Sequence, residues 1–147
     1  MKAGKVALAL ALMAGPAQAA GEADPGAFHW QARCEVTEAN NRKKCTVARG
    51  PVGFVVLERA GLGMFCGAGL AFPAATVAAR VDDNAPHEWS AGAYPPRKLT
   101  MLVAEAREGE ALRCREPKWP SGIAELEAKL DGFGAAMDAA ERFIAAE

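Results

Sequence analysis

The feature of this sequence that most constrains its fold is a pair of cysteines, Cys34 and Cys45, placed on either side of Asn40-Asn41. Apolar and polar residues alternate from Trp30 to Val36, which is typical of a half-buried strand. Asparagine tolerates a positive φ angle and therefore favours a turn after this strand. Because cysteines equidistant from a turn face each other across paired strands, the stretch predicts a β-hairpin closed by a disulfide.

Two further cysteines, Cys66 and Cys114, bring the total to four, and an even number favours disulfides in an exported chain. The sequence lacks the CxxC-type spacing of zinc sites and thiol oxidoreductases and the CxxCH of c-type haem proteins. We therefore expect no metal and no cofactor. Pairing Cys34 with Cys45 leaves a Cys66–Cys114 bond by elimination.

The first residues have the pattern of a secretory signal peptide, with a positive start, a short apolar segment and the small residues AQA at 17–19. We expect a signal peptide over residues 1–19, a disordered leader over residues 20–28 and a single β-rich domain over residues 29–147. No later stretch reaches the roughly 20 apolar residues that a membrane-spanning helix needs. The sequence therefore predicts a periplasmic or secreted protein without a stable transmembrane segment.

Short apolar segments separated by glycine and proline turns make up most of the chain. Val52–Leu57 is a continuous apolar run, typical of a strand buried on both sides, and Thr76–Val81 is a short strand before an acidic turn. Ala85–Lys98 carries three prolines and predicts a long ordered loop. Leu99–Ala106 and Ala111–Arg115 predict a hairpin across a glycine turn. This pattern indicates a mainly β fold, an antiparallel β-sandwich or a barrel-like domain.

The C-terminal segment differs because its apolar residues follow helical spacing, and Asp131 is placed to cap a helix. One face of this amphipathic α-helix carries Phe133, Ala136, Met137, Ala140, Phe143 and Ile144. We expect this C-terminal helix to cover the open end of its own sheet. The preceding segment, Ile123–Leu130, is ambiguous, because its composition favours a helix and its strict alternation favours a strand.

Four groups of short motifs follow one another along the chain: HWQARCE with KKCTV, then VAARVDD, then LVAEAREGEALRC, and finally LDGFGAAMDA. In this order, and with a W-x-x-x-C opening, the chain resembles the invasion-associated locus B family of bacterial exported proteins. The resemblance covers most of the chain after the leader. It implies a β-rich fold, a strand at Ile123–Leu130 and a link to host-cell invasion.

The chain departs from this family in its second pair of cysteines. In the family, that pair tends to lie close together in the central part of the chain. Here Cys66 and Cys114 are far apart and fall on different expected strands. A bond between them would bridge one sheet to the other.

The inventory of reactive side chains predicts no catalytic residue. A Ser-His-acid triad would have to combine His87 and Ser90 with Asp82 or Glu88, and no nucleophile elbow surrounds either serine at residues 90 and 121. Glutamates between residues 105 and 110 are expected to keep an exposed edge soluble. We therefore expect a protein that is not an enzyme.

Aromatic side chains are the expected binding residues, because they dominate interface energies. Trp89 and Tyr94 lie in the proline-rich segment from Ala85 to Arg97, and Trp119 is the third candidate. The alternative is that the rings of Trp89 and Tyr94 fold back as a lid on the sheets.

The expected function is that of an exported, non-enzymatic envelope or host-interaction protein with an unidentified protein or surface partner. The alternatives are a periplasmic inhibitor or chaperone-like binding module and a small secreted hydrolase. The chain has 17 basic and 18 acidic residues, without the clustered basic excess that usually marks nucleic-acid binding.

Overall fold

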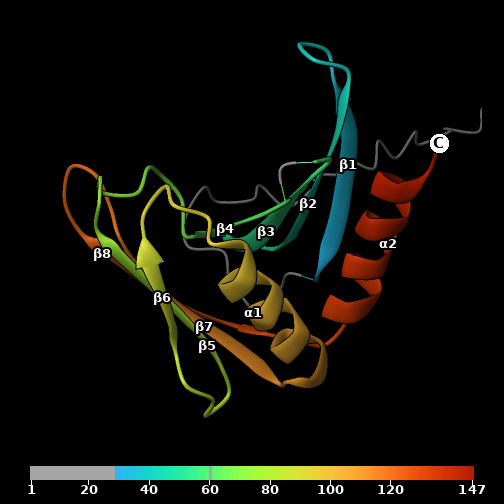
Figure 1. The fold of residues 1–147 in the computed structure, drawn as a ribbon. Helices are drawn as coiled ribbons and strands as arrows, with labels where there is room; N and C mark the ends of the chain where they lie inside the picture. The colour runs from blue at the N-terminus through green and yellow to red at the C-terminus, as the bar shows by residue number, and fades with distance from the viewer. Residues whose placement is uncertain (1–28, 60) are drawn as a thin grey trace, which may run out of the picture.

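The computed structural model of the chain describes residues 29–59 and 61–147 (Figure 1). Within these residues, two antiparallel four-stranded sheets and two helices form the fold. The expectation of a mainly β fold is confirmed, whereas the expectation of a single helix is wrong. The predicted signal peptide and leader lie outside the described residues.

The first sheet has the strand order β1-β2-β3-β4 and consists of β1 (Gln31–Thr37), β2 (Arg42–Arg49), β3 (Val52–Leu57) and β4 (Gly61–Cys66). Successive strands pair with one another because short turns join them. Asn41 lies in the β1–β2 turn with φ 54°, as its tolerance of positive φ predicts. The sequence thus determines this sheet largely through its local turns.

The second sheet has the strand order β6-β5-β7-β8 and consists of β5 (Thr76–Val81), β6 (His87–Ser90), β7 (Ala111–Pro117) and β8 (Ile123–Lys129). β5 pairs with β6 on one side and with β7 on the other. The segment Ile123–Leu130, whose composition favoured a helix and whose alternation favoured a strand, therefore contains strand β8. Its alternation indicated the structure correctly because one of its two faces packs against the core.

Helix α1 (Pro96–Glu108) stands where the sequence pattern predicted the first strand of a hairpin. That prediction was wrong because the buried residues recur at helical spacing: Leu99, Leu102, Val103 and Ala106. Pro96 suits the first turn of a helix, where no backbone N–H is required. The prediction of a long loop over Ala85–Lys98 was also wrong, since β6 and the start of α1 lie within it.

Helix α2 (Phe133–Ala145) packs against β1, β2 and β3, and Figure 1 shows it beside β1. Its buried residues are Phe133, Ala136, Met137 and Ala140, as the amphipathic pattern predicts. The predicted cap is wrong, because Gly132 occupies the N-cap position and no side chain caps the helix. Asp131 instead accepts a hydrogen bond from Arg49 Nη1 at 2.7 Å.

Aromatic rings pack together where α2 meets the first sheet. The ring of Phe133 lies 5.0 Å from that of Trp30 and 5.6 Å from that of Phe54, measured between centroids. Trp30 Nε1 also donates a hydrogen bond to the carbonyl of Lys129 at 2.7 Å, which links the start of the first sheet to the end of β8. The two sheets and α2 therefore share one core.

Both predicted disulfides are present. Cys34–Cys45 joins β1 to β2 inside the first sheet, where the two residues are direct register partners. Cys66–Cys114 joins β4 to β7 and so connects the two sheets. No helix among residues 29–59 and 61–147 is long and apolar enough to cross a membrane.

Candidate binding site

The three aromatic residues predicted to bind a partner occupy different environments. Trp89, a residue of β6, is only 7% exposed and belongs to the core. Tyr94, just before α1, is exposed on one side, and its ring lies against Gly63 of β4. Trp119, between β7 and β8, is 55% exposed. The alternative, in which the rings of Trp89 and Tyr94 fold back on the sheets, therefore describes the position of Trp89. Trp119 faces solvent instead.

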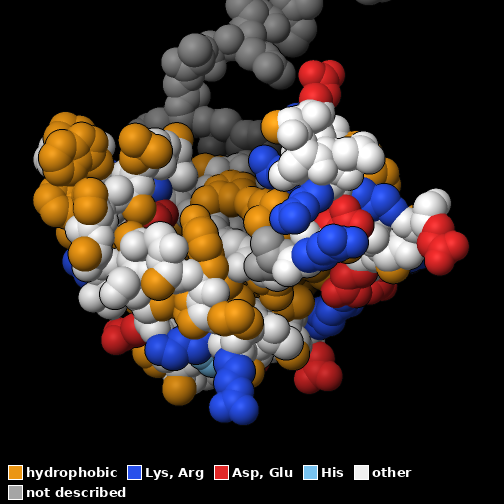
Figure 2. All heavy atoms as spheres, turned by 45° about the horizontal axis from the view of Figure 1, so that its top comes forward, with side chains coloured by type: hydrophobic (Ala, Val, Ile, Leu, Met, Phe, Trp, Pro, Cys, Tyr) orange, Lys and Arg blue, Asp and Glu red, His pale blue; other side chains and the backbone are white. Residues whose placement is uncertain are grey.

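Trp119 belongs to a cluster of exposed apolar side chains that sequence reasoning missed. We call Leu70, Phe72, Trp119 and Ile123 the apolar tip. They are 75%, 40%, 55% and 54% exposed in that order, and the rings of Phe72 and Trp119 lie 5.3 Å apart. Figure 2 shows hydrophobic side chains gathered on the left of the molecule, the side on which β8 begins in Figure 1.

Backbone hydrogen bonds between two distant segments build the apolar tip. The first segment, residues 67–75, joins β4 to β5, and the second, residues 118–122, joins β7 to β8. The Phe72 N–H donates to the Pro117 carbonyl at 2.8 Å, and the Trp119 N–H donates to the Leu70 carbonyl at 2.9 Å. The Lys118 N–H closes the second turn on the Gly122 carbonyl at 2.8 Å. These bonds bring the backbones of Leu70, Phe72 and Trp119 together, and Ile123 lies beside them as the register partner of Pro117.

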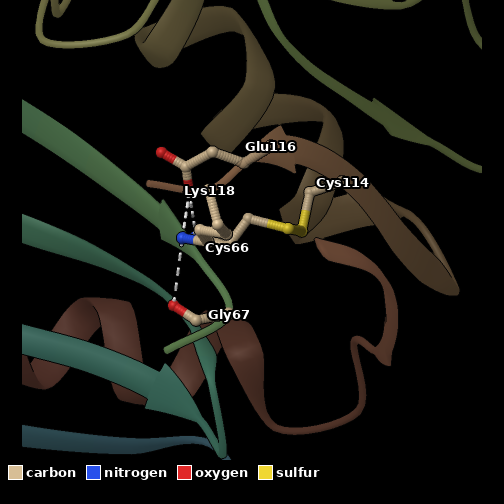
Figure 3. A network of polar contacts seen from close by, with 5 residues as sticks. All are labelled: Cys66, Gly67, Cys114, Glu116 and Lys118. Atoms are coloured by element: carbon tan, nitrogen blue, oxygen red, sulfur yellow. Dashed lines mark hydrogen bonds and ion pairs between the residues drawn. A yellow bond between two sulfur atoms is a disulfide. The ribbon is translucent and has the colours of Figure 1, made fainter. Parts of the chain in front are cut away.

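A buried polar network supports the base of the apolar tip (Figure 3). Glu116 Oε2 lies 2.8 Å from Lys118 Nζ and accepts the backbone N–H of Cys66 at 3.3 Å. Lys118 Nζ also donates to the Gly67 carbonyl at 3.4 Å. The side chain of Lys118 is only 13% exposed, so its charge is directed inward. The Cys66–Cys114 disulfide lies beside this network.

Gly67 allows the two segments to approach closely at this base. Its φ of +81° is a conformation that residues with a side chain rarely adopt. A Cβ atom at this position would lie 2.8 Å from the Cβ of Ala124, at the start of β8. The glycine that follows β4 is therefore required for the contact between the two segments.

Three of the residues considered for catalysis, His87, Glu105 and Asp82, have structural partners. His87 Nε2 lies 3.2 Å from both carboxylate oxygens of Glu105 on α1. The Asp82 carboxylate accepts the backbone N–H groups of Glu110 and Ala111, which fixes the turn before β7. Over residues 29–59 and 61–147, no group of three His, Cys, Asp or Glu residues is arranged to hold a metal ion.

A hollow lies on the outer face of the second sheet. It has a volume of about 380 Å³, and the residues that line it include Ala78, Arg80 and Pro86. On the same face, Arg113 pairs with Glu127 at 2.7 Å and Arg115 with Glu125 at 3.0 Å. These cross-strand pairs are exposed to solvent, so they contribute little to stability. They pair four of the charged side chains on this face with one another.

Comparisons with protein-family models, with curated proteins and with solved structures find no match for this chain.

Proposed function

We propose that the chain is an exported, non-enzymatic interaction protein that acts at the bacterial envelope or on a host surface, and that the apolar tip is its binding surface. One observation carries this proposal: four large apolar side chains lie exposed together at one end of the domain. Contiguous exposed apolar patches mark interaction sites, whereas singly scattered apolar residues do not.

The remaining properties of the chain are consistent with this function. Two disulfides favour an oxidising compartment, and the first residues have the pattern of an export signal. The two-sheet architecture supports a β-sandwich of the kind that resemblance to the invasion-associated locus B family implies. In that family setting, the domain works by contact with a partner and not by chemical conversion of a substrate.

The test is binding of the exported, oxidised protein to intact host cells and to bacterial envelope preparations. Replacing Leu70 and Trp119 by serine removes the two most exposed side chains of the apolar tip. We expect binding to fall at least tenfold, because aromatic anchors at an interface each contribute about 2 kcal/mol or more.

Met101→Ser is the matched control, because Met101 is a large apolar residue on α1 that is 55% exposed but lies outside the apolar tip. It should bind like the unaltered protein, and all variants should melt at similar temperatures. Equal binding by the tip variant and the control, or no binding to either surface, would refute the proposal.

A further inference from the structure

We infer that the apolar tip binds phospholipid bilayers directly, by placing Leu70, Phe72, Trp119 and Ile123 in the membrane interface. This inference rests on the proposed function and names the chemical class of the partner. Three properties of the tip favour a lipid surface over a protein partner: its lack of free charge, its paired backbone and the types of its side chains.

The apolar tip carries no charge that a bilayer would have to desolvate. Residues 67–75 (GAGLAFPAA) and 119–124 (WPSGIA) contain no Asp, Glu, Lys, Arg or His. Lys118, which directly precedes Trp119, directs its ammonium inward to Glu116 and the Gly67 carbonyl. A zwitterionic lipid interface also has no net charge, so the two surfaces are complementary, whereas an exposed ammonium here would oppose insertion.

The same segments offer little to a protein partner. The Ser121 hydroxyl and the Trp119 indole N–H are the only hydrogen-bonding side-chain groups among residues 67–75 and 119–124. A typical protein–protein interface makes about ten direct hydrogen bonds around its apolar centre. A lipid surface requires no such set of directional contacts.

Several backbone groups of the apolar tip are already paired, which favours a lipid environment because unpaired peptide groups are costly there. The N–H groups of Phe72 and Trp119 donate to carbonyls of the neighbouring segment, and that of Lys118 closes its own turn. Pro73 and Pro120 stand beside the two aromatic residues and have no N–H to satisfy. Both segments can therefore enter the interface without exposing these donors.

The side chains of the tip are those expected for shallow insertion. Tryptophan prefers the membrane interface, where its ring contacts acyl chains and its N–H reaches polar groups. The Arg115–Glu125 ion pair lies two residues along the strands from Pro117 and Ile123, which are register partners at the tip. Because the charged side chains begin at Arg115 and Glu125, insertion should stop at the interface.

The test uses the exported, oxidised protein and vesicles of pure phosphatidylcholine. Trp119 is an internal reporter, since Trp30 and Trp89 are each only 7% exposed. We expect vesicles to shift the emission of Trp119 to shorter wavelength, and brominated acyl chains to quench it. Raising the salt concentration should change binding little, because no ion pair with lipid is involved.

Leu70→Ser and Ile123→Ser both keep Trp119 as the reporter. Each should lower vesicle binding about tenfold, because each removes one large apolar side chain that would be buried in the lipid. Met101→Ser should bind normally. The inference is overturned if the unaltered protein does not bind these vesicles, or if both tip variants bind as well as it does. Binding that requires anionic lipid and disappears in salt would also overturn it, and would point to the basic residues Arg42, Lys43 and Lys44 at the start of β2.

The same variants separate this inference from the proposed function. If the tip variants lose binding to cells or envelope preparations while pure lipid vesicles bind nothing, the partner is a protein and only the lipid inference fails. If the variants bind cells, envelope preparations and vesicles like the unaltered protein, both proposals fail.

Discussion

At the scale of single residues, Arg49 links elements that are distant in the sequence. Its guanidinium is 7% exposed and donates hydrogen bonds to the Lys129 carbonyl at 2.9 Å and to Asp131, which is 82 residues away, at 2.7 Å. The hydrogen bond from Arg49 lowers the pKa of the Asp131 carboxyl below its usual value of 3.8. β2 is thereby joined to the start of α2.

We predict that Asp131→Asn lowers the melting temperature at neutral pH, because it leaves the Arg49 guanidinium without its carboxylate. A carboxyl whose pKa is lower in the folded state stabilises the fold above its unfolded pKa, and this stabilisation is lost as the pH falls through the folded value. The difference between variant and unaltered protein should therefore shrink below about pH 3.8. Thermal melts from pH 2 to 7 measure it, with Glu38→Gln in the β1–β2 turn as the control. A difference independent of pH would contradict the prediction.

The Glu116–Lys118 pair is a second contact that depends on both partners. We predict that Lys118→Met destabilises the fold by about 3–5 kcal/mol, because it leaves the Glu116 carboxylate, in a residue only 8% exposed, without a counter-charge. Adding Glu116→Gln should restore part of the loss. Urea unfolding gives both free energies. If the double variant is no more stable than Lys118→Met, the pair does not act as a unit.

At the scale of elements, Phe133 is the largest fully buried side chain of α2. Phe133 is fully buried between Trp30 and Phe54, whereas Phe143, near the other end of the helix, is only partly buried. The helix is thus anchored at its N-terminal end, directly after the junction with β8.

We predict that Phe133→Ala lowers the free energy of unfolding by about 3–5 kcal/mol, the usual cost of removing a buried phenylalanine. Phe143→Ala makes the same chemical change at a less buried position and should cost clearly less. Chemical unfolding of both variants measures the difference. Equal losses, or an unchanged melting temperature for Phe133→Ala, would mean that α2 is not packed as described.

At the scale of the whole molecule, the Cys66–Cys114 disulfide holds the two sheets together. It spans 48 residues of sequence, whereas Cys34–Cys45 spans 11 and reinforces a hairpin that its turn already favours. A cross-link that closes a longer loop removes more conformational entropy from the unfolded chain.

We predict that replacing Cys66 and Cys114 by alanine destabilises the protein more than replacing Cys34 and Cys45, each pair contributing on the order of 2–4 kcal/mol. Peptide mapping without reductant first verifies the remaining bond in each variant, and unfolding in denaturant then ranks them. Free thiols in the unaltered oxidised protein, or the opposite order of stability, would contradict this account.

The parts of the fold that were predicted correctly depend on neighbouring residues. The alternation of β1, the turn at Asn41 and the apolar face of α2 are each properties of about ten consecutive residues. The Cys34–Cys45 bond follows from the same local symmetry. Such features are written in the sequence because side-chain period and turn chemistry act over short distances.

What the tertiary structure decided depends on which distant segments meet. The run Leu99–Ala106 became a helix because its buried side chains pack against β4, β5 and α2, and Asp131 left the cap position to pair with Arg49. Trp119 was identified from sequence as a binding candidate, but its neighbours Leu70 and Phe72 lie in the distant segment that joins β4 to β5. Local patterns encode the period of an element, whereas burial and surface clusters arise only when long-range contacts bring elements together.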